Sequence, residues 1–104
     1  MHTRVKVHLT QHHISRGVAN DCDSCPVALA IMGALPGVSR VDVGEAGMDL
    51  HNRMVTRFYR GPRDAIGTAV YTPKAVVNFV KAFDDGHEVE PFTFTLRVPD
   101  WATA

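Results

Sequence analysis

The sequence has little of several features that mark special classes of protein. Its 104 residues include two cysteines, one tryptophan, and 11 basic side chains balanced by 11 acidic ones. The formal net charge is therefore zero. A chain without excess cations is a poor general candidate for gripping nucleic-acid phosphates, because non-specific binding depends on cationic side chains that release counterions.

Long apolar runs are also missing. The longest, residues 27–35, is well short of the roughly 18 apolar residues that a membrane-spanning helix needs. The first residues, Met1 to Lys6, are not followed by an apolar run of signal-peptide length. We therefore expect a cytoplasmic protein with no membrane contact. In that compartment a lone pair of cysteines is more often reduced, metal-bound or redox-active than a permanent crosslink.

The chain does have an ordinary globular composition. Hydrophobic residues make up 45% of it, which suits one packed core and is too high for a disordered chain. The length fits a single independently folding unit, so we expect residues 1–104 to form one domain.

Apolar residues at every second position predict strands. Such alternation occurs at residues 5–9 and 92–98, and strands are also expected at 38–43 and 48–59. A hairpin loop is expected at 44–47, and a further short buried strand within 65–71. The polar segment 11–24 is expected to be a loop containing one short helical turn at 12–16.

Two longer helices are predicted from their end signals. Pro26 suits the first turn of a helix that Pro36 and Gly37 end, and this helix is apolar nearly all round, so it should be the most buried element. Thr72 as cap and Pro73 at the first helical position begin the second helix. Its apolar residues recur at helical spacing until Gly86 closes it.

The element order is therefore β-α-β-β-(β)-α-β, in which the strand in parentheses is the one expected within 65–71. We expect an α+β domain built on a small antiparallel or mixed sheet of four to five strands. Both helices would pack on one face of this sheet, because that arrangement buries every apolar stripe.

The two cysteines form the one local motif that suggests chemistry. Cys22 and Cys25 are separated by two residues, and Cys25 precedes a helix whose positive end stabilises a thiolate. A dithiol-disulfide oxidoreductase uses this logic, with one cysteine attacking and the other resolving. The flanking Asp21 and Asp23 oppose thiolate formation.

A zinc-stabilised binding module is a second interpretation of the same segment. Cys22 and Cys25 supply half of a tetrahedral site, and His12 and His13 lie on the same predicted loop. We expect no cofactor, and zinc stays open as the one alternative. A plain packing role, with the cysteines as small buried hydrophobes at a helix start, is the commoner one for such residues.

The basic residues gather around the third predicted strand. The candidate nucleic-acid-binding residues are Arg53, Arg57, Tyr59, Arg60 and Arg63. If Arg40 and Arg97 lie on adjacent strands of the same face, an exposed basic and aromatic sheet surface results, on which single-stranded nucleic acid could stack. A solvated sheet face is the plainer interpretation and is favoured here, since the chain as a whole carries no excess positive charge.

Three segments resemble short proteins of actinobacteria and their bacteriophages that have no assigned activity. They are DCDSCPVALA at residues 21–30, FVKAFD at 79–84 after Pro73, and VEPFTF at 89–94. The resemblance implies an accessory protein of phage or prophage origin that acts by binding a host or phage component. It assigns no catalytic or binding residue.

No convergent set of catalytic side chains stands out in the sequence. We therefore expect a non-enzymatic interaction protein that binds a protein partner, or a second copy of itself, through a sheet face or a sheet edge. The zinc module, the dithiol oxidoreductase and the single-stranded nucleic-acid binder stay open as alternatives.

Overall fold

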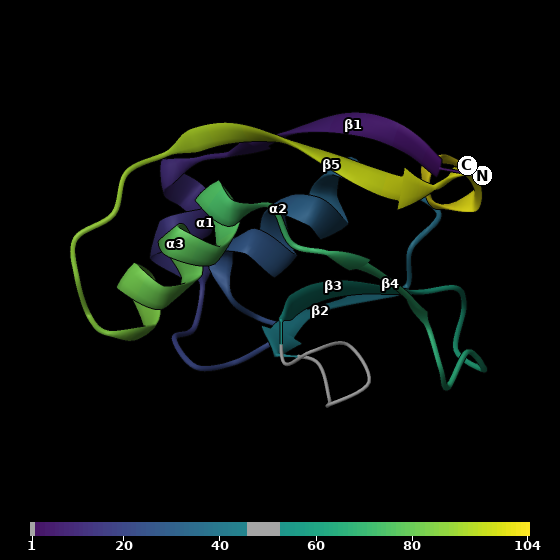
Figure 1. Cartoon of the computed structure of the whole chain (residues 1–104), viewed down its shortest axis with the longest axis horizontal. Coiled ribbons are helices and arrows are strands. Elements are labelled where there is room, and N and C mark those ends of the chain that lie inside the picture. The colour runs from purple at the N-terminus through teal and green to yellow at the C-terminus, as the bar shows by residue number, and fades with distance from the viewer. Residues whose placement is uncertain (1, 46–52) are drawn as a thin grey trace.

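The computed structural model describes residues 2–45 and 53–104 (Figure 1). In chain order the elements are β1 (His2–Leu9), α1 (Gln11–Arg16), α2 (Pro26–Ala34), β2 (Arg40–Glu45), β3 (Met54–Tyr59), β4 (Thr68–Tyr71), α3 (Lys74–Asp84), β5 (Phe92–Pro99) and the 3-10 helix η2 (Asp100–Thr103). The domain is α+β, as the sequence predicts. Part of the expected loop 44–47 and the first part of the expected strand 48–59 lie outside the described residues.

The strands form two antiparallel sheets rather than one. The first strand pairs with the last, β1 with β5, from His2 opposite Pro99 to Leu9 opposite Phe92. The other sheet has the order β2-β3-β4. Figure 1 shows the start of β1 beside the end of β5, and there the Thr3 hydroxyl donates to an Asp100 carboxylate oxygen at 2.6 Å.

The expectation of one sheet with both helices on one face is therefore wrong in its layering. Helix α2 contacts both β1 and β2, and it lies between the two sheets (Figure 1). The reason is visible in its sequence, since a helix that is apolar nearly all round has to be covered on more than one side. A single sheet covers only one side of it.

The core is centred on α2. The helix begins after Cys25 with Pro26 in its first turn, as predicted, and Val27, Ala28 and Ile31 are wholly buried. Around them lie the inward-facing residues of both sheets and of α3, which include Val7, Leu9, Val41, Phe58, Val76, Leu96 and Val98.

Helix α3 begins one residue later than predicted. Pro73, not Thr72, is its capping residue, and no side chain caps it. The Thr72 hydroxyl instead bonds the Thr56 hydroxyl of β3 at 2.9 Å, and both residues are buried. Burial of the Thr56 hydroxyl requires a partner, and Thr72 provides it at the expense of the helix cap.

Candidate functional site: the open edge of β4

A cleft of about 450 Å³ lies where the two sheets approach each other without pairing. It is lined by His2, Ala69, Val70, Tyr71, Pro73, Thr95 and Arg97. These residues belong mainly to β4 and β5, the two strands that face each other across the gap between the sheets. Each of them pairs with a neighbour on its other side only.

The edge of β4 that faces this cleft carries free backbone groups. The Thr72 N–H donates to the Met54 carbonyl at 3.0 Å, and β4 then continues antiparallel along β3 with Val70 opposite Thr56. Hydrogen-bonded and non-hydrogen-bonded pairs alternate in such a ladder. The backbone N–H and C=O groups of Val70 therefore point toward β3. The N–H and C=O groups of Ala69 and Tyr71 therefore point away from β3, toward the cleft.

The outer edge of β2, unlike that of β4, has a backbone group with a hydrogen-bond partner outside the sheet. The Val43 N–H donates to the Cys22 carbonyl at 2.7 Å, so the loop before α2 satisfies this backbone donor. Among residues 2–45 and 53–104, no comparable backbone hydrogen bond reaches Ala69 or Tyr71.

Exposed apolar side chains flank the open edge. Ile66 is 78% exposed and Tyr71 is 44% exposed, and they are two of the three large hydrophobic residues that are exposed in the described part of the chain. The segment 65–71 was expected to hold a buried strand. The observed β4 is instead only half-buried, which corrects that expectation.

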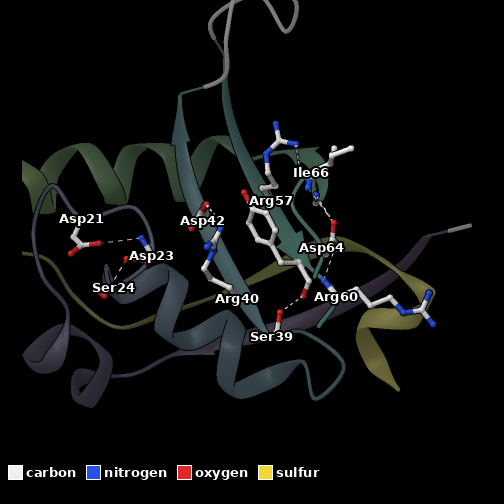
Figure 2. Close-up of polar contacts among 12 residues, drawn as sticks. Asp21, Asp23, Ser24, Ser39, Arg40, Asp42, Arg57, Arg60, Asp64 and Ile66 are labelled. Atoms are coloured by element: carbon white, nitrogen blue, oxygen red, sulfur yellow. Dashed lines mark hydrogen bonds and ion pairs between the residues drawn. The ribbon is translucent and has the colours of Figure 1, made fainter. Parts of the chain in front are cut away.

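A polar loop fixes the start of β4. One Asp64 carboxylate oxygen accepts the Gly67 N–H at 2.9 Å and the Ile66 N–H at 3.3 Å, and the other accepts the Arg60 N–H at 2.9 Å (Figure 2). These backbone donors stabilise the charged carboxylate and lower the pKa of Asp64. Gly67 has a φ of +73°, and a Cβ there would lie 2.7 Å from the Cγ of Arg57, so only glycine fits this position without displacement.

The outer face of β2 and β3 holds part of the basic and aromatic set that the sequence singled out. Arg40 lies opposite Tyr59, with its guanidinium carbon 4.0 Å from the centre of the Tyr59 ring, and it forms an ion pair with Asp42 at 3.5 Å. Arg57 shares this face, and its guanidinium donates to the Ile66 carbonyl at 3.0 Å (Figure 2). Tyr59 is buried to all but 8%. The ring face that a nucleobase would need is therefore covered.

The other basic residues are dispersed around this face. The guanidinium carbon of Arg53 lies 4.1 Å from the centre of the Tyr71 ring, and that of Arg60 lies 5.6 Å from the Trp101 ring. Arg63 is exposed in the loop before β4. Arg97 lies on β5 in the other sheet, so the condition of a shared basic face is met by Arg40 on β2 but not by Arg97.

Cys25 occupies a structural position at the start of α2. It is 3% exposed, and its sulfur accepts the Ala28 N–H at 3.4 Å as the cap of the helix. Burial raises the pKa of the Cys25 thiol. Cys22 is exposed in the preceding loop, where partial burial and the nearby Asp42 and Asp23 carboxylates raise its pKa as well. Raised pKa values oppose the thiolate that redox attack needs.

The two histidines of the predicted zinc set lie on α1. The His13 Nδ1 accepts the Thr10 N–H at 3.0 Å, which engages one ring nitrogen in local structure. Burial, with a smaller contribution from His12, lowers the pKa of His13. In the described ranges no group of three or more His, Cys, Asp or Glu side chains is placed to hold a metal ion.

No family model, curated protein or solved structure matches the chain. No helix within the described residues has both the length and the apolar character needed to cross a membrane.

Sequence reasoning did not single out Ala69 and Tyr71. The one available signal was the short alternating stretch before Pro73, which predicted a strand but not which neighbours it would have. An edge strand cannot be told from a central one when the order of the strands is unknown.

Proposed function

We propose that this chain is a non-enzymatic interaction module that takes up an extended segment of a protein partner along the open edge of β4. The observation that carries the proposal is the pair of unpartnered residues, Ala69 and Tyr71, whose backbone groups face the cleft between β4 and β5. Strand addition to a sheet edge uses such groups for affinity and uses hollows beside the edge for side-chain selectivity.

The surroundings of this edge support docking of a protein. Exposed apolar side chains mark interaction surfaces, and Ile66 and Tyr71 lie within or next to β4. The free edge of β1 is less suited, because the hollow beside it is smaller, about 270 Å³, and its lining includes Lys6, His8 and His13 rather than a large apolar side chain.

The cleft has little that would support catalysis. Its lining, as described, offers an imidazole, a phenol, a guanidinium and one threonine hydroxyl, but no carboxylate and no thiol. Nucleophilic and acid–base catalysis require a nucleophile and a base held in hydrogen-bond contact, and no such pair lines this cleft. A role in binding fits this set of groups better.

A test of the proposal starts from a display library of random twelve-residue peptides. We expect wild-type protein to enrich peptides, and the amide resonances of Ala69 and Tyr71 to shift when an enriched peptide is titrated in. Replacing Ala69 by proline removes one edge donor without touching the β3 ladder. Loss of one hydrogen bond and of close backbone approach predicts affinity lower by about tenfold or more in Ala69→Pro.

Ala69→Ser is the matched control, because it changes the same side chain but keeps the N–H group. It should bind within a few-fold of wild type, and both variants should keep the wild-type circular dichroism spectrum. Failure to enrich any peptide, or equal binding to wild type and Ala69→Pro, would overturn the proposal. Sedimentation velocity on the wild-type protein alone would detect self-pairing of β4, which would replace a foreign partner by a second copy.

A further inference from the structure

We infer that the segment received by the β4 edge is acidic, with Asp or Glu at alternate positions. This inference rests on the proposed function and specifies the chemistry of the partner. It follows from the side chains that line the two hollows beside the edge, which include cations and, among the described residues, no carboxylate.

The sheet that forms the far wall of the cleft exposes a row of basic side chains. Successive outward-facing residues of β1 are His2, Arg4, Lys6 and His8. His2 lines the cleft, whereas Lys6 and His8 line the hollow beside the free edge of β1. Arg97 of β5 lies directly opposite Arg4 in the register. Like charges directly opposite each other destabilise a sheet, so this arrangement is unfavourable unless an anion is shared between them.

Arg4, Lys6 and Arg97 form no ion pair with a carboxylate within the described ranges. The ion pair found there joins Arg40 to Asp42 on the other sheet. Asp100 lies just beyond β5, but its carboxylate accepts the Thr3 hydroxyl. Arg4, Lys6 and Arg97 therefore present their charge to solvent and, in the case of Arg97, to the cleft.

A second hollow at the other end of β4 has the same sign. It measures about 350 Å³, and its lining is Arg53, Met54, Thr72, Lys74, Val77, Asn78 and Lys81. Three of these residues are cations and none is a carboxylate. Lys81 forms no ion pair with Asp84 of its own helix or with Asp85 directly after it, so its ammonium group is not neutralised by them.

Several of the acidic residues lie away from the β4 edge. Asp85, Glu88 and Glu90 lie at or after the end of α3, on the connection to β5 that Figure 1 places at the end of the molecule away from the chain termini. Asp21 and Asp23 lie in the loop before α2. Asp64 lies in the loop before β4, but its carboxylate accepts three backbone N–H groups. Among the described residues, the hollows beside the edge are therefore lined by cations without carboxylates, and such a surface steers partners of opposite sign toward it.

Two other ligands for this edge, a second copy of the chain and a nucleic acid, fit the same surroundings less well. A second copy pairing through β4 would bring Arg97 and Arg53 near the equivalent cations of its partner, and such like-charge contacts oppose association. A nucleic acid would satisfy the charge but would leave the backbone groups of Ala69 and Tyr71 unused. The Arg53 guanidinium also already covers one face of the Tyr71 ring.

Three synthetic octapeptides test the inference. One alternates valine with glutamate, and its twins carry glutamine or lysine in place of glutamate. We expect the glutamate peptide to bind about tenfold more tightly than the glutamine peptide at low salt, and this advantage to shrink to about twofold or less near 1 M salt, where charges are screened within about 3 Å. The lysine peptide should bind weakest.

Variants of the protein show which residues cause the preference for the glutamate peptide. Arg97→Gln should remove most of the preference for glutamate over glutamine, whereas Arg16→Gln, the same change on the surface of α1, should keep it. Ala69→Pro should weaken both peptides equally. Equal binding of the glutamate and glutamine peptides, with both weakened by Ala69→Pro, would overturn the acidic preference and leave the edge function standing.

Two other outcomes point elsewhere. Absence of binding by all three peptides, together with unshifted Ala69 and Tyr71 amides, would overturn both the inference and the proposed function. A twelve-nucleotide oligothymidylate could instead bind more tightly than the glutamate peptide, with the same sensitivity to Arg97→Gln. That result would show that the ligand is a nucleic acid and not an acidic protein segment.

Discussion

At the scale of single residues, the buried threonine pair is the clearest case of a polar interaction that determines local structure. Thr56 and Thr72 satisfy each other inside the protein. Thr72→Val should therefore lower the free energy of unfolding by about 1–3 kcal/mol, because it leaves the Thr56 hydroxyl buried without a partner. The measurement is urea denaturation followed by circular dichroism.

The double variant Thr56→Val/Thr72→Val provides the internal control. Since it removes both polar groups, it should lose less stability than the sum of the two single changes. Thr95→Val, on the exposed face of β5, should have little effect. Simple additivity of the Thr56 and Thr72 changes would contradict the pairing.

The two cysteines should behave differently from each other. Cys25→Ala removes the sulfur that accepts the Ala28 N–H at the start of α2, and we expect it to lower stability by about 1 kcal/mol, the usual cost of a lost cap. Cys25→Ser keeps an acceptor and should cost less, and Cys22→Ser should be close to neutral. Thermal melting of the three variants checks this.

The raised pKa values add a kinetic expectation. Both thiols should react with iodoacetamide near neutral pH more slowly than a thiol in an unstructured peptide. The zinc and dithiol hypotheses each predict a different result. A zinc site would be favoured if Cys22→Ser destabilises the protein as much as Cys25→Ala does and if a chelator destabilises the wild type. Redox chemistry would be favoured if the Cys22 thiol reacts fast with iodoacetamide.

At the scale of elements, the loop between β3 and β4 depends on one carboxylate. The pKa of Asp64 is lowered in the folded protein by the backbone N–H donors of Arg60, Gly67 and Ile66. A carboxyl group with a lowered folded pKa stabilises the fold fully above its unfolded pKa, and this stabilisation is lost as the pH falls through the folded pKa. Asp64→Asn should therefore lower the melting temperature at pH 7.

The pH dependence is the specific part of this prediction. The difference in melting temperature between wild type and Asp64→Asn should shrink as the pH falls below the usual carboxyl range. Asp85→Asn is the control, because a negative charge at the end of α3 is unfavourable to the helix and its removal should not destabilise. A difference that stays constant down to acid pH would show that the charge of Asp64 plays no part.

Element types could largely be predicted from the sequence, because their signals are local. The alternation at 5–9 and 92–98 and the helix at 26–35 are confirmed by β1, β5 and α2. The cap of α3 was misplaced because the choice between Pro73 and Thr72 depends on Thr56, a residue distant in sequence. The site at β4 was missed for the same kind of reason, since strand order is a property of the whole chain.

At the scale of the whole molecule, the arrangement of layers was the least predictable feature. A sequence pattern says which face of a strand or helix is apolar, but it does not say whether one sheet or two will cover it. The all-round apolar character of α2 was recognised, yet its consequence, cover from both sides, requires that residues 2–9 and 40–45 meet the same helix from different sheets. The cleft between β4 and β5 is a product of that division.

The pairing of β1 with β5 also has a consequence for how the chain reaches its fold. Thr3 and Asp100, which bond to each other, are 97 positions apart in the sequence, so this sheet closes only by bringing nearly the full length of the chain together. Contacts of such long range slow folding, because the entropy of closing the loop is lost before the contacts form. During synthesis on a ribosome, β1 emerges well before β5. Until β5 follows, the edge of β1 that pairs with it remains uncovered, so nascent chains of this protein are expected to require chaperones.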